Sequence, residues 1–421
     1  MGASINNATK VPGRIRIYKR YYARDSLLYD SGEFDESESG MTIKIRGNTS
    51  AFAPKKPYKI KLQKKKDLLF RGDEDTYKDK EWLLLKDDYL LTTAGFIVSE
   101  LVGMTWVPGH RFVNVIINND YKGVYLLCES VKRNPDCRLN VDKNTGYIFE
   151  CDPYWWNEDV YVNSITAPKY NFTFKYPDSD EITADQLDYI QRVVTRYENS
   201  LKTENYPQYI DVESFAAWCL THDILGTQDS GGSNRYYTKN DSTDDSKIVM
   251  PLVWDFDMCE RTNNAWSNCH TDHMSQLFNN SNRKFVDAYA GLWRKLEDKI
   301  IQDFTQGLND FSSFQDGFAV NSCFQLDEIV WGNTLSVYGS IITHKNWMSN
   351  RQPWMTTKIA ALNPQGDTNV DGIVNMDDLT HLINVLVYNN VDYPYASDVN
   401  RDSVIGMDDL TYLINLLVLG N

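Results

Sequence analysis

The sequence predicts an α+β protein, in which a large domain of mixed strands and helices is followed by a small all-α domain. Two periodic patterns support this prediction. The segments "MTIKIRG" and "YKIKL" alternate between apolar and other residues, which is typical of half-buried strands. Near the C-terminus, apolar residues recur at helical spacing within a repeated unit. A chain of 421 residues also suggests more than one domain.

The two strands that begin at Met41 and Tyr58 are expected to carry cations on one face, because residues two apart share a face of a strand. These cations are Lys44, Arg46, Lys59 and Lys61. A helix is expected at about Leu90 to Val102. The following "RFVNVIINNDYKGVYLLCESV" predicts a β-hairpin that turns at residues 118–120.

Further along, "VESFAAWCLTHDILG" predicts a helix that ends at Gly226. The stretch from Ser233 to Met258 is expected to form a strand, a polar turn and a second, buried strand. Residues 292–358 are expected to be helical and carry no motif that indicates a function.

The composition excludes some classes of protein. A formal charge of −15 argues against a general nucleic-acid binder, because neutralising phosphates requires a basic surface. No apolar run reaches the roughly 20 residues of a membrane span. The N-terminus has no apolar signal region, so we expect either a cytoplasmic chain or a removed leader. Seven irregularly spaced cysteines favour ordinary core thiols.

A domain boundary is expected near "ALNPQGD", which separates residues 1–362 from residues 363–421. The segment beginning at Asp367 is closely repeated 31 positions later, at Asp398. Each copy ends in a helix with one apolar face, and the two faces are expected to bury each other. The residues of these faces are Leu379, Leu382, Ile383 and Leu386 in the first copy and Leu410, Leu413, Ile414 and Leu417 in the second.

Both copies predict a calcium loop, because oxygen ligands stand at alternate positions of a short segment. Loop 367–378 offers Asp367, Asn369, Asp371, the carbonyl of Ile373, Asn375 and Asp378. Loop 398–409 offers Asp398, Asn400, Asp402, the carbonyl of Val404 and Asp409. The second loop has Ser403 where the first has the turn glycine, and Gly406 in place of an asparagine. We therefore expect the second site to be the weaker one, and a solvated acidic turn is the alternative for both.

An EF-hand would have a helix before each loop, whereas here the loop follows a Pro/Gly connector, and position 12 is Asp rather than the usual Glu. From Gly366 to about Gly420 the pattern resembles a dockerin, a calcium-dependent docking module. The resemblance implies two Ca²⁺ ions, a cohesin module of a scaffold protein as partner, and an extracellular complex that degrades polysaccharides. The residues it implies for cohesin contact are Met376, Asp377, Met407, Asp408 and the adjacent helix positions Thr380, His381, Thr411 and Tyr412.

A second acidic group lies in "LVWDFDM", where Asp255 and Asp257 are two apart and are expected to point the same way from a buried strand. Upstream, Asp229 and Asn234 have the spacing D-x-x-x-x-N. Phosphoryl transfer uses an Asp that orients a hydroxyl, metal-binding Asn and Asp, and a lysine on the phosphates.

In this sequence Lys59 or Lys61 is the candidate lysine, with Glu129 as the anion that orients it. The alternatives are purely structural. They are a cap and turn at residues 229–234, a solvated basic strand face at residues 59–61, and salt-bridging aspartates at 255 and 257.

Five blocks in order resemble the CotH family of atypical protein kinases: "IKIRGNTSAFAPKKPYKIKL", "WLLLKDDYLLTTAGFIVSEL", "RFVNVIINNDYKGVYLLCESV", "GTQDSGGSNRYYT" and "VMPLVWDFDM". The resemblance covers residues 43–260, with residues 261–362 as a helical remainder. It implies a kinase-like fold that lacks a glycine-rich phosphate loop.

The resemblance implies that Asp229 is the catalytic Asp, Asp255 a magnesium ligand and Lys61 the phosphate lysine in preference to Lys59. The further residues that it implies near metal or nucleotide are Asn234, Asp257, Arg46 and Glu129. Trp254 is a candidate for stacking on adenine, with a core position as the alternative.

The expected function is transfer of the γ-phosphoryl of ATP, with Mg²⁺, to a Ser or Thr of a protein. Because ATP is scarce outside cells, a non-catalytic component that binds a glycan or a protein is the alternative. A glycoside hydrolase with paired aspartates is a third class. It needs carboxyl groups roughly 5–10 Å apart across a sugar, and Asp255 and Asp257 are near the lower end of that range.

Overall fold

The computed structural model describes residues 4–21, 24–73, 75–166, 170–230, 234–313, 317–332 and 337–419. The chain divides into two compact units, and each is described by itself. The first unit comprises residues 1–90, 108–140 and 310–340. The second comprises residues 91–107, 141–309 and 341–421.

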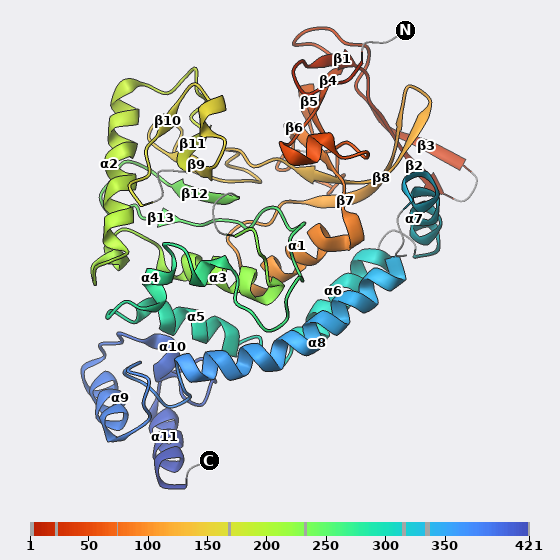
Figure 1. Ribbon diagram of the computed structural model, residues 1–421. Helices are drawn as coiled ribbons and strands as arrows, with labels where there is room; N and C mark the ends of the chain where they lie inside the picture. Colours follow the sequence, from red (N-terminus) through yellow and green to blue (C-terminus); the bar gives the residue numbers. More distant parts are fainter. Residues whose placement is uncertain are drawn as a thin grey trace. The chain divides into compact units, whose positions relative to one another are not determined.

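The first unit is built on a six-stranded antiparallel sheet in the order β1-β4-β5-β6-β8-β7, with β2 and β3 pairing separately (Figure 1). Its strands are β1 (Val11–Gly13), β2 (Arg16–Tyr21), β3 (Arg24–Asp30), β4 (Met41–Ile45), β5 (Tyr58–Lys66), β6 (Asp79–Leu85), β7 (His110–Ile117) and β8 (Asp120–Glu129). Helix α7 (Gly317–Trp331) packs on β8.

The alternation in β4 and β5 gives this sheet its two faces. Ile43 pairs with Ile60, and both side chains are buried in the core of the unit. Lys44 pairs with Lys59 on the opposite face, as the sequence predicts. The predicted hairpin of β7 and β8 is confirmed, and Asn118 and Asn119 both have positive φ at its turn. Two consecutive residues of this kind match the twist of the flanking strands.

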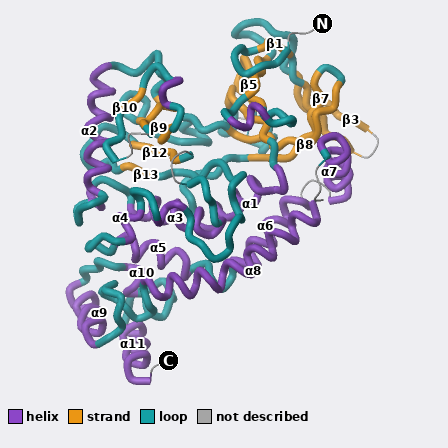
Figure 2. Tube along the Cα trace, viewed as in Figure 1, coloured by secondary structure: helices purple, strands orange, loops and turns teal. Residues whose placement is uncertain are grey.

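The second unit contains a five-stranded antiparallel sheet in the order β10-β11-β9-β12-β13, together with most of the helices (Figure 2). Its strands are β9 (Tyr147–Asp152), β10 (Tyr161–Val162), β11 (Asn171–Tyr176), β12 (Arg235–Lys239) and β13 (Ile248–Val249). Its helices up to residue 294 are α1 (Leu91–Val102), α2 (Ala184–Ser200), α3 (Val212–Leu225), α4 (Ser275–Phe278) and α5 (Lys284–Arg294). Helices α6 (Ile300–Ser313) and α8 (Val337–Leu362) follow and have residues in both units.

Helix α3 is the central layer of the second unit, with the sheet on one side and α5 on the other (Figure 1). Its residues 214–225 are all buried, which explains why its sequence is apolar all around. The helix begins after Asp211, whose side chain accepts a hydrogen bond from the Ser214 amide, and ends at Gly226 in the left-handed conformation. The predicted ends of this helix and of α1 are confirmed within one residue.

The expected buried strand leading to Asp257 is the main correction to the sequence-based fold. Strand β13 covers only Ile248 and Val249, and residues 254–258 are irregular. Pro251 lacks the amide that would continue a ladder, and Asp255 has a φ of 66°. A β-strand requires negative φ at each residue, so the chain turns here and the two aspartates come from a turn.

Residues 363–419 contain helices α9 (Met376–Tyr388), α10 (Pro394–Ser397) and α11 (Met407–Leu419). Leu382 and Leu413 are fully buried together with Val399, and the four other leucines of the predicted faces pack around them. Ile383 and Ile414 are each 41% exposed, so the prediction that they join this core is wrong. Ile383 lies about 100° around the helix from the buried Leu382, whereas the buried Val385 lies on the other side of Leu382, so the buried face is rotated away from the isoleucine.

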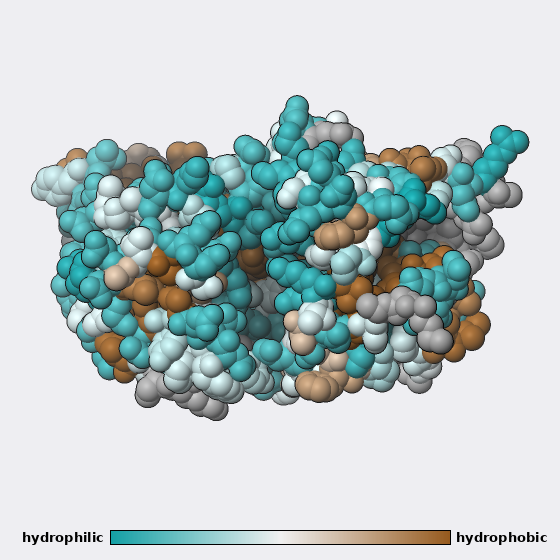
Figure 3. Space-filling model, turned by 90° about the horizontal axis from the view of Figure 1, so that it is seen from above, coloured by the Kyte–Doolittle hydropathy of each residue, from teal (hydrophilic) through white to brown (hydrophobic). Residues whose placement is uncertain are grey.

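Hydrophilic residues cover most of the face of the molecule drawn in Figure 3, in keeping with 24% charged residues. Within the described ranges no helix combines the length and the apolar character that crossing a membrane requires. All seven cysteines are free thiols, and five of them are buried.

Candidate functional site

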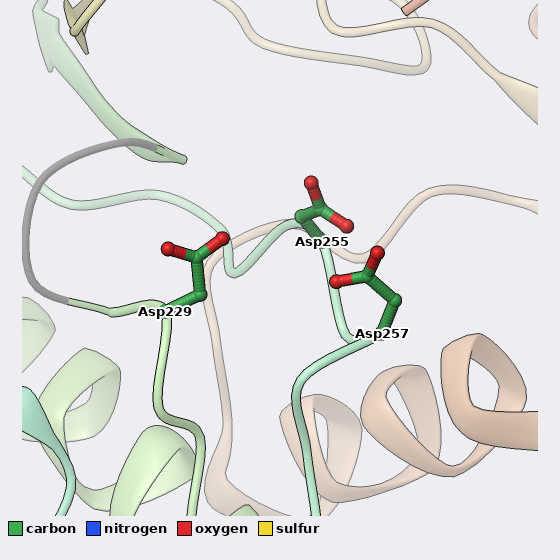
Figure 4. Close-up of side chains that lie close together, drawn as sticks. All are labelled: Asp229, Asp255 and Asp257. Atoms are coloured by element: carbon green, nitrogen blue, oxygen red, sulfur yellow. The ribbon is translucent and has the colours of Figure 1, made fainter. Parts of the chain in front are cut away.

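Three carboxyl groups of the second unit lie together. Asp229, Asp255 and Asp257 are all exposed, and each contributes one oxygen to a group in which all oxygens are within 4.8 Å of one another. Figure 4 shows their side chains directed toward a shared space, from the loop after α3 and from the turn that follows β13. We call these residues the aspartate cluster. The sequence predicted all three as site residues, and the structure brings them together.

The turn that carries Asp255 and Asp257 is anchored by its aromatic residues. Trp254 and Phe256 are buried and contact Phe96 of α1, with ring centroids 6.2 and 5.5 Å away. A Cβ added to Gly95 would lie 2.2 Å from the Phe256 ring, so the glycine makes room for it. With the residues before and between the two aspartates buried, both carboxylates face water. Trp254 therefore has the core position that the sequence left as an alternative to stacking on adenine.

Asp229 reaches the cluster because the loop after α3 is bonded to the segment after Asp257. The Gln228 amide donates to the Met258 carbonyl at 3.2 Å, and the Glu260 amide donates to the Leu225 carbonyl at 2.8 Å. The Thr227 hydroxyl and the Cys259 thiol form a buried contact at 3.2 Å. These bonds hold two segments side by side that are about 30 residues apart in the sequence.

The carboxyl groups of the cluster affect one another electrostatically. The pKa of the Asp229 carboxyl is raised because the surrounding protein removes part of its water and because Asp257 places a second negative charge nearby. A divalent cation would relieve this repulsion. Carboxylate oxygens on a water-accessible surface are suitable ligands for Mg²⁺, which keeps several waters and binds one or two carboxylates together with phosphate oxygens.

Asn234 lies next to the cluster segment but is not one of its members. The bridge between Arg235 and Val253 places the residue before β12 beside the start of the turn. Asn234 has a φ of 64°, which asparagine tolerates better than most residues. The glycines at 231 and 232, which the sequence suggests as a source of loop freedom, lie outside the described residues.

The candidate phosphate lysines belong to the first unit. Lys59 Nζ lies 2.7 Å from Glu81 of β6, and Lys61 Nζ lies 3.8 Å from the same carboxylate. Burial lowers the pKa of Lys59, although Glu81 opposes this shift. Burial would raise the pKa of Glu81, but its attraction to Lys59 lowers it overall. Lys59 is the more enclosed of the two, with 34% of its side chain exposed against 46% for Lys61.

Glu129 is not the partner of either lysine, contrary to expectation. Its carboxylate accepts a hydrogen bond from Arg71 at 2.9 Å and one from the Gly109 amide at 2.9 Å. Glu81, and not Glu129, is the anion that pairs with the two lysines. Strand β6 is paired with β5, and Glu81 stands opposite Lys61 in that register. Arg46 directly follows β4 and donates its backbone amide to the Pro57 carbonyl.

Sequence reasoning missed Glu81 and the contacts that stabilise the cluster. The signal for Glu81 was the strand "DKEWLLL", because an acidic residue on the polar face of a strand next to a basic strand predicts a cross-strand ion pair. The bond between Thr227 and Cys259 has no comparable local signal, because it joins segments separated by a strand and a turn.

The two predicted calcium loops repeat one pattern of contacts. In the first, Asp367 accepts from the amides of Asp371 and Gly372, while the Asp378 carboxylate accepts from the amides of Asn369 and Asn375. The second loop has the equivalent bonds. Asp398 accepts from the amides of Asp402 and Ser403, and Asp409 from those of Asn400 and Gly406. The carboxylate at the end of each loop is thus hydrogen-bonded to an amide near the start of the same loop.

Burial raises the pKa of the Asp367 carboxyl to about 6, with further contributions from Asp378 and Asp371. Crowded carboxylates and amide oxygens are the donor set that Ca²⁺ uses, so both loops fit that ion. Their acidic groups are less tightly gathered than the aspartate cluster, which among the described residues forms the one set of three within 4.8 Å.

Comparison with solved structures finds a chain of a complex from Shewanella oneidensis MR-1, described as a toxin antitoxin system of HipA and HipB with operator DNA. The alignment covers 69% of this chain and 63% of that chain, at 12% identity and a TM-score of 0.28. The chain thus spans less than two thirds of that relative, and so weak a likeness carries no argument. No curated protein matches the chain.

The comparison with protein families gives a clear result. The family model described as CotH kinase protein matches residues 43–311, which is more than half of the chain. The match contains both candidate lysines and the whole aspartate cluster. The chain therefore belongs to the CotH kinase family.

Proposed function

We propose that this protein is a phosphotransferase that moves the γ-phosphoryl group of ATP to a Ser or Thr hydroxyl of a protein. The observation that carries the proposal is the aspartate cluster, a set of three carboxylates gathered from two distant segments within the region matched by the kinase family. Three exposed like charges repel one another, and a folded chain that keeps them together indicates a cation-binding role.

Within the cluster, Asp229 is proposed to orient the attacking hydroxyl and accept its proton. Its raised pKa suits this role, because a stronger base accepts a proton more readily near neutral pH. Asp255 and Asp257 are proposed as the ligands of Mg²⁺, with Asn234 beside them. Bound Mg²⁺ and ATP would supply the transferable phosphoryl group and neutralise its charge.

The lysines of the first unit are proposed to bind the phosphates. Lys61 is the residue that the family pattern favours, and Lys59 is the residue that Glu81 holds more closely. Arg46 is proposed as a further cation near the nucleotide. For Glu129, pairing with Arg71 supports a structural role rather than contact with the lysines.

The direct test is transfer of labelled phosphate from ATP, with Mg²⁺, to a serine-rich acceptor protein. Asp229→Ala and Asp255→Ala should each abolish transfer, whereas Asp75→Ala, a change at an exposed surface ion pair, should retain it. Absence of nucleotide binding by the unsubstituted protein would refute the proposal.

The C-terminal repeat is proposed to be a dockerin that attaches the protein to a cohesin of an extracellular scaffold in a polysaccharide-degrading complex. The matched contacts of loops 367–378 and 398–409 support two Ca²⁺ sites. Met376 and Met407, at equivalent positions of the two copies, are 62% and 66% exposed. Large apolar side chains exposed this far suggest a protein partner, with Asp377 and Asp408 beside them.

One observation favours the second candidate function, a component that binds glycans without catalysis. Tyr154, Trp156 and Tyr161 are exposed, and Trp155 lies among them with its ring centroid 4.6 Å from that of Tyr161. Exposed aromatic rings offer flat apolar surfaces with polar edges, which suit sugar rings. Suppose that Trp156→Ala weakened binding to a polysaccharide, while neither Asp229→Ala nor Asp255→Ala changed the binding of ATP or the transfer of its phosphate. This candidate function would then replace the kinase.

A further inference from the structure

The segment between the two C-terminal loops packs against helix α5, a helix of the family-matched region (Figure 1). The helical turn α10 and the residue before it, Tyr393, form this contact, and we call residues 393–397 the interloop segment. All of these residues belong to the second unit. The contact therefore joins the C-terminal repeat to the region that carries the aspartate cluster.

Tyr395 is the centre of the contact. Its ring lies against Gly291 so closely that a Cβ on the glycine would be 2.1 Å from the ring. The Tyr395 hydroxyl donates to Glu213, and Lys295 Nζ lies 4.5 Å from the ring centroid. A glycine within a helix is less favourable than an alanine, and here it leaves the space that the ring fills.

Polar groups fix the backbone of the segment on the same helix. The buried Asp287 carboxylate accepts the Ala396 amide at 2.7 Å and the Tyr395 amide at 3.3 Å. Amides at the start of a helical turn have no acceptor within that turn. Asp287 of α5 is the acceptor for the first amides of α10. Lys284 and Asp392 add an ion pair at 3.7 Å.

The contact continues directly into the second calcium loop. Asp398, the first proposed ligand, is the residue after α10. Arg401, at the fourth position of the loop, has a φ of 66° and forms an ion pair with Glu297 at 2.7 Å. Ser403 has a φ of 71° at the position where the first loop has Gly372. The first loop has the same left-handed backbone at its fourth position, where Val370 has a φ of 57°, but a glycine at its sixth. Loop 398–409 thus has one more left-handed residue that is not glycine, and an additional outside contact through Arg401.

We propose that calcium binding by loop 398–409 and docking of the interloop segment on α5 are coupled. Docking positions Asp398 and Arg401 and so removes part of the ordering cost of binding. By linkage, an occupied loop must stabilise the docked segment by the same factor. Helix α5 would then respond to calcium, although it contributes none of the proposed ligands. This inference rests on the proposed calcium loops but is independent of any kinase activity.

The test uses hydrogen exchange of the full-length protein at increasing calcium, because peptides report each loop separately from the aspartate cluster. In the unsubstituted protein, calcium should protect residues 398–409 and also residues 284–294. Gly291→Ala should raise the calcium concentration for half-protection of loop 398–409 by about 5- to 150-fold, the usual range of such coupling. It should also remove the calcium-dependent protection of α5.

Two further variants show whether the Tyr395 ring is the cause. Tyr395→Ala should cause a shift of similar size and also covers the case in which Gly291→Ala does not fold. Adding Gly291→Ala to Tyr395→Ala should then change nothing more, because the ring that clashes is gone. Gly307→Ala, a glycine of α6 whose added Cβ would meet Ile97 instead, should leave the calcium dependence unchanged.

Each outcome distinguishes this inference from the proposed function. Calcium protection of loop 398–409 with the same midpoint in all variants would overturn the coupling and leave the calcium site intact. Absence of calcium protection in both loops would overturn the proposed sites and the coupling with them.

Discussion

The aspartate cluster and the calcium loops are both acidic, but they are assembled in different ways. Each predicted calcium loop has its proposed ligands within twelve consecutive residues, and its first carboxylate accepts hydrogen bonds from amides of the same loop. The cluster takes Asp229 from one segment and Asp255 and Asp257 from another, and contacts between other residues hold them together. The proposed ligands of both loops are therefore local, although loop 398–409 also has an outside contact through Arg401, whereas the cluster depends on the tertiary fold.

This difference determines how each site should respond to loss of its ion and to mutation. A site with local ligands should respond mainly to its ion, and loop 398–409 should respond also to docking of the interloop segment on α5. A site joined from distant segments should respond to packing changes at residues that never touch a ligand.

The largest effect is expected from removing a cluster carboxylate. Asp255→Ala or Asp229→Ala should lower phosphoryl transfer by at least about 100-fold, since a positioned proton acceptor alone typically contributes 10²- to 10⁴-fold. Thermal unfolding should change little, because both residues are exposed. Initial rates with labelled ATP provide the measurement. An unchanged rate in either variant would contradict the assigned roles.

The next effect is expected on removing calcium with a chelator. Helices α9 and α11 should lose protection from hydrogen exchange, because folding of such loops is coupled to ligation. Helix α2 should stay protected, since it packs on the sheet and not on the loops or α5. Excess Mg²⁺ is the control and should not restore the helices, because a smaller, strictly octahedral ion fits a calcium loop poorly. Equal protection with and without calcium would contradict the loop assignment.

A smaller effect tests the dependence of the cluster on packing. Gly95→Ala places a Cβ 2.2 Å from the Phe256 ring, between the two aspartates in sequence. Overpacking of this kind typically costs 1–3 kcal/mol and would displace Asp255 and Asp257. We expect weaker binding of Mg²⁺ with nucleotide, measured by calorimetry.

Gly291→Ala is the matched control for this change, because it also meets an aromatic ring, that of Tyr395, but should leave nucleotide binding intact. Equal nucleotide affinity in the Gly95→Ala and unsubstituted proteins would show that the cluster does not depend on this contact.

The smallest effect concerns pH. Burial raises the pKa of Asp287 from 3.8 to about 7, so the folded protein retains this proton at a pH where the unfolded chain has lost it. Its contribution to stability is complete below about pH 4 and is lost as the pH rises through about 7. The slope cannot exceed about 1.4 kcal/mol per pH unit for one proton. Asp287→Asn should flatten the dependence of unfolding free energy on pH in this window, and an unchanged slope would contradict the assignment.

Local patterns in the sequence predicted much of the fold. The alternation in β4 and β5, the Asn118–Asn119 turn and the capped helix α3 each depend on neighbouring residues, and each is confirmed. The aspartates themselves were also found, because their spacing and the family pattern indicated them.

The features that the sequence did not predict depend on contacts between residues that are distant in the sequence. The pairing of Lys59 with Glu81 follows from strand register, and the exposure of Ile383 follows from which face of α9 packs on the rest of the chain. The turn at Asp255 replaces the expected strand because Phe256 packs on α1. These contacts join residues far apart in the sequence, so the local spacing of apolar and polar residues does not predict them.

The central claim is that the aspartate cluster binds the metal of a nucleotide, and calorimetric titration with a non-hydrolysable ATP analogue tests it most directly. In the presence of Mg²⁺ the protein should bind the analogue, and binding should be lost without the metal and in Asp255→Asn, which keeps the side-chain shape but removes its charge. Equal affinity of the unsubstituted and Asp255→Asn proteins for the analogue, or binding of the analogue that does not depend on Mg²⁺, would contradict the account.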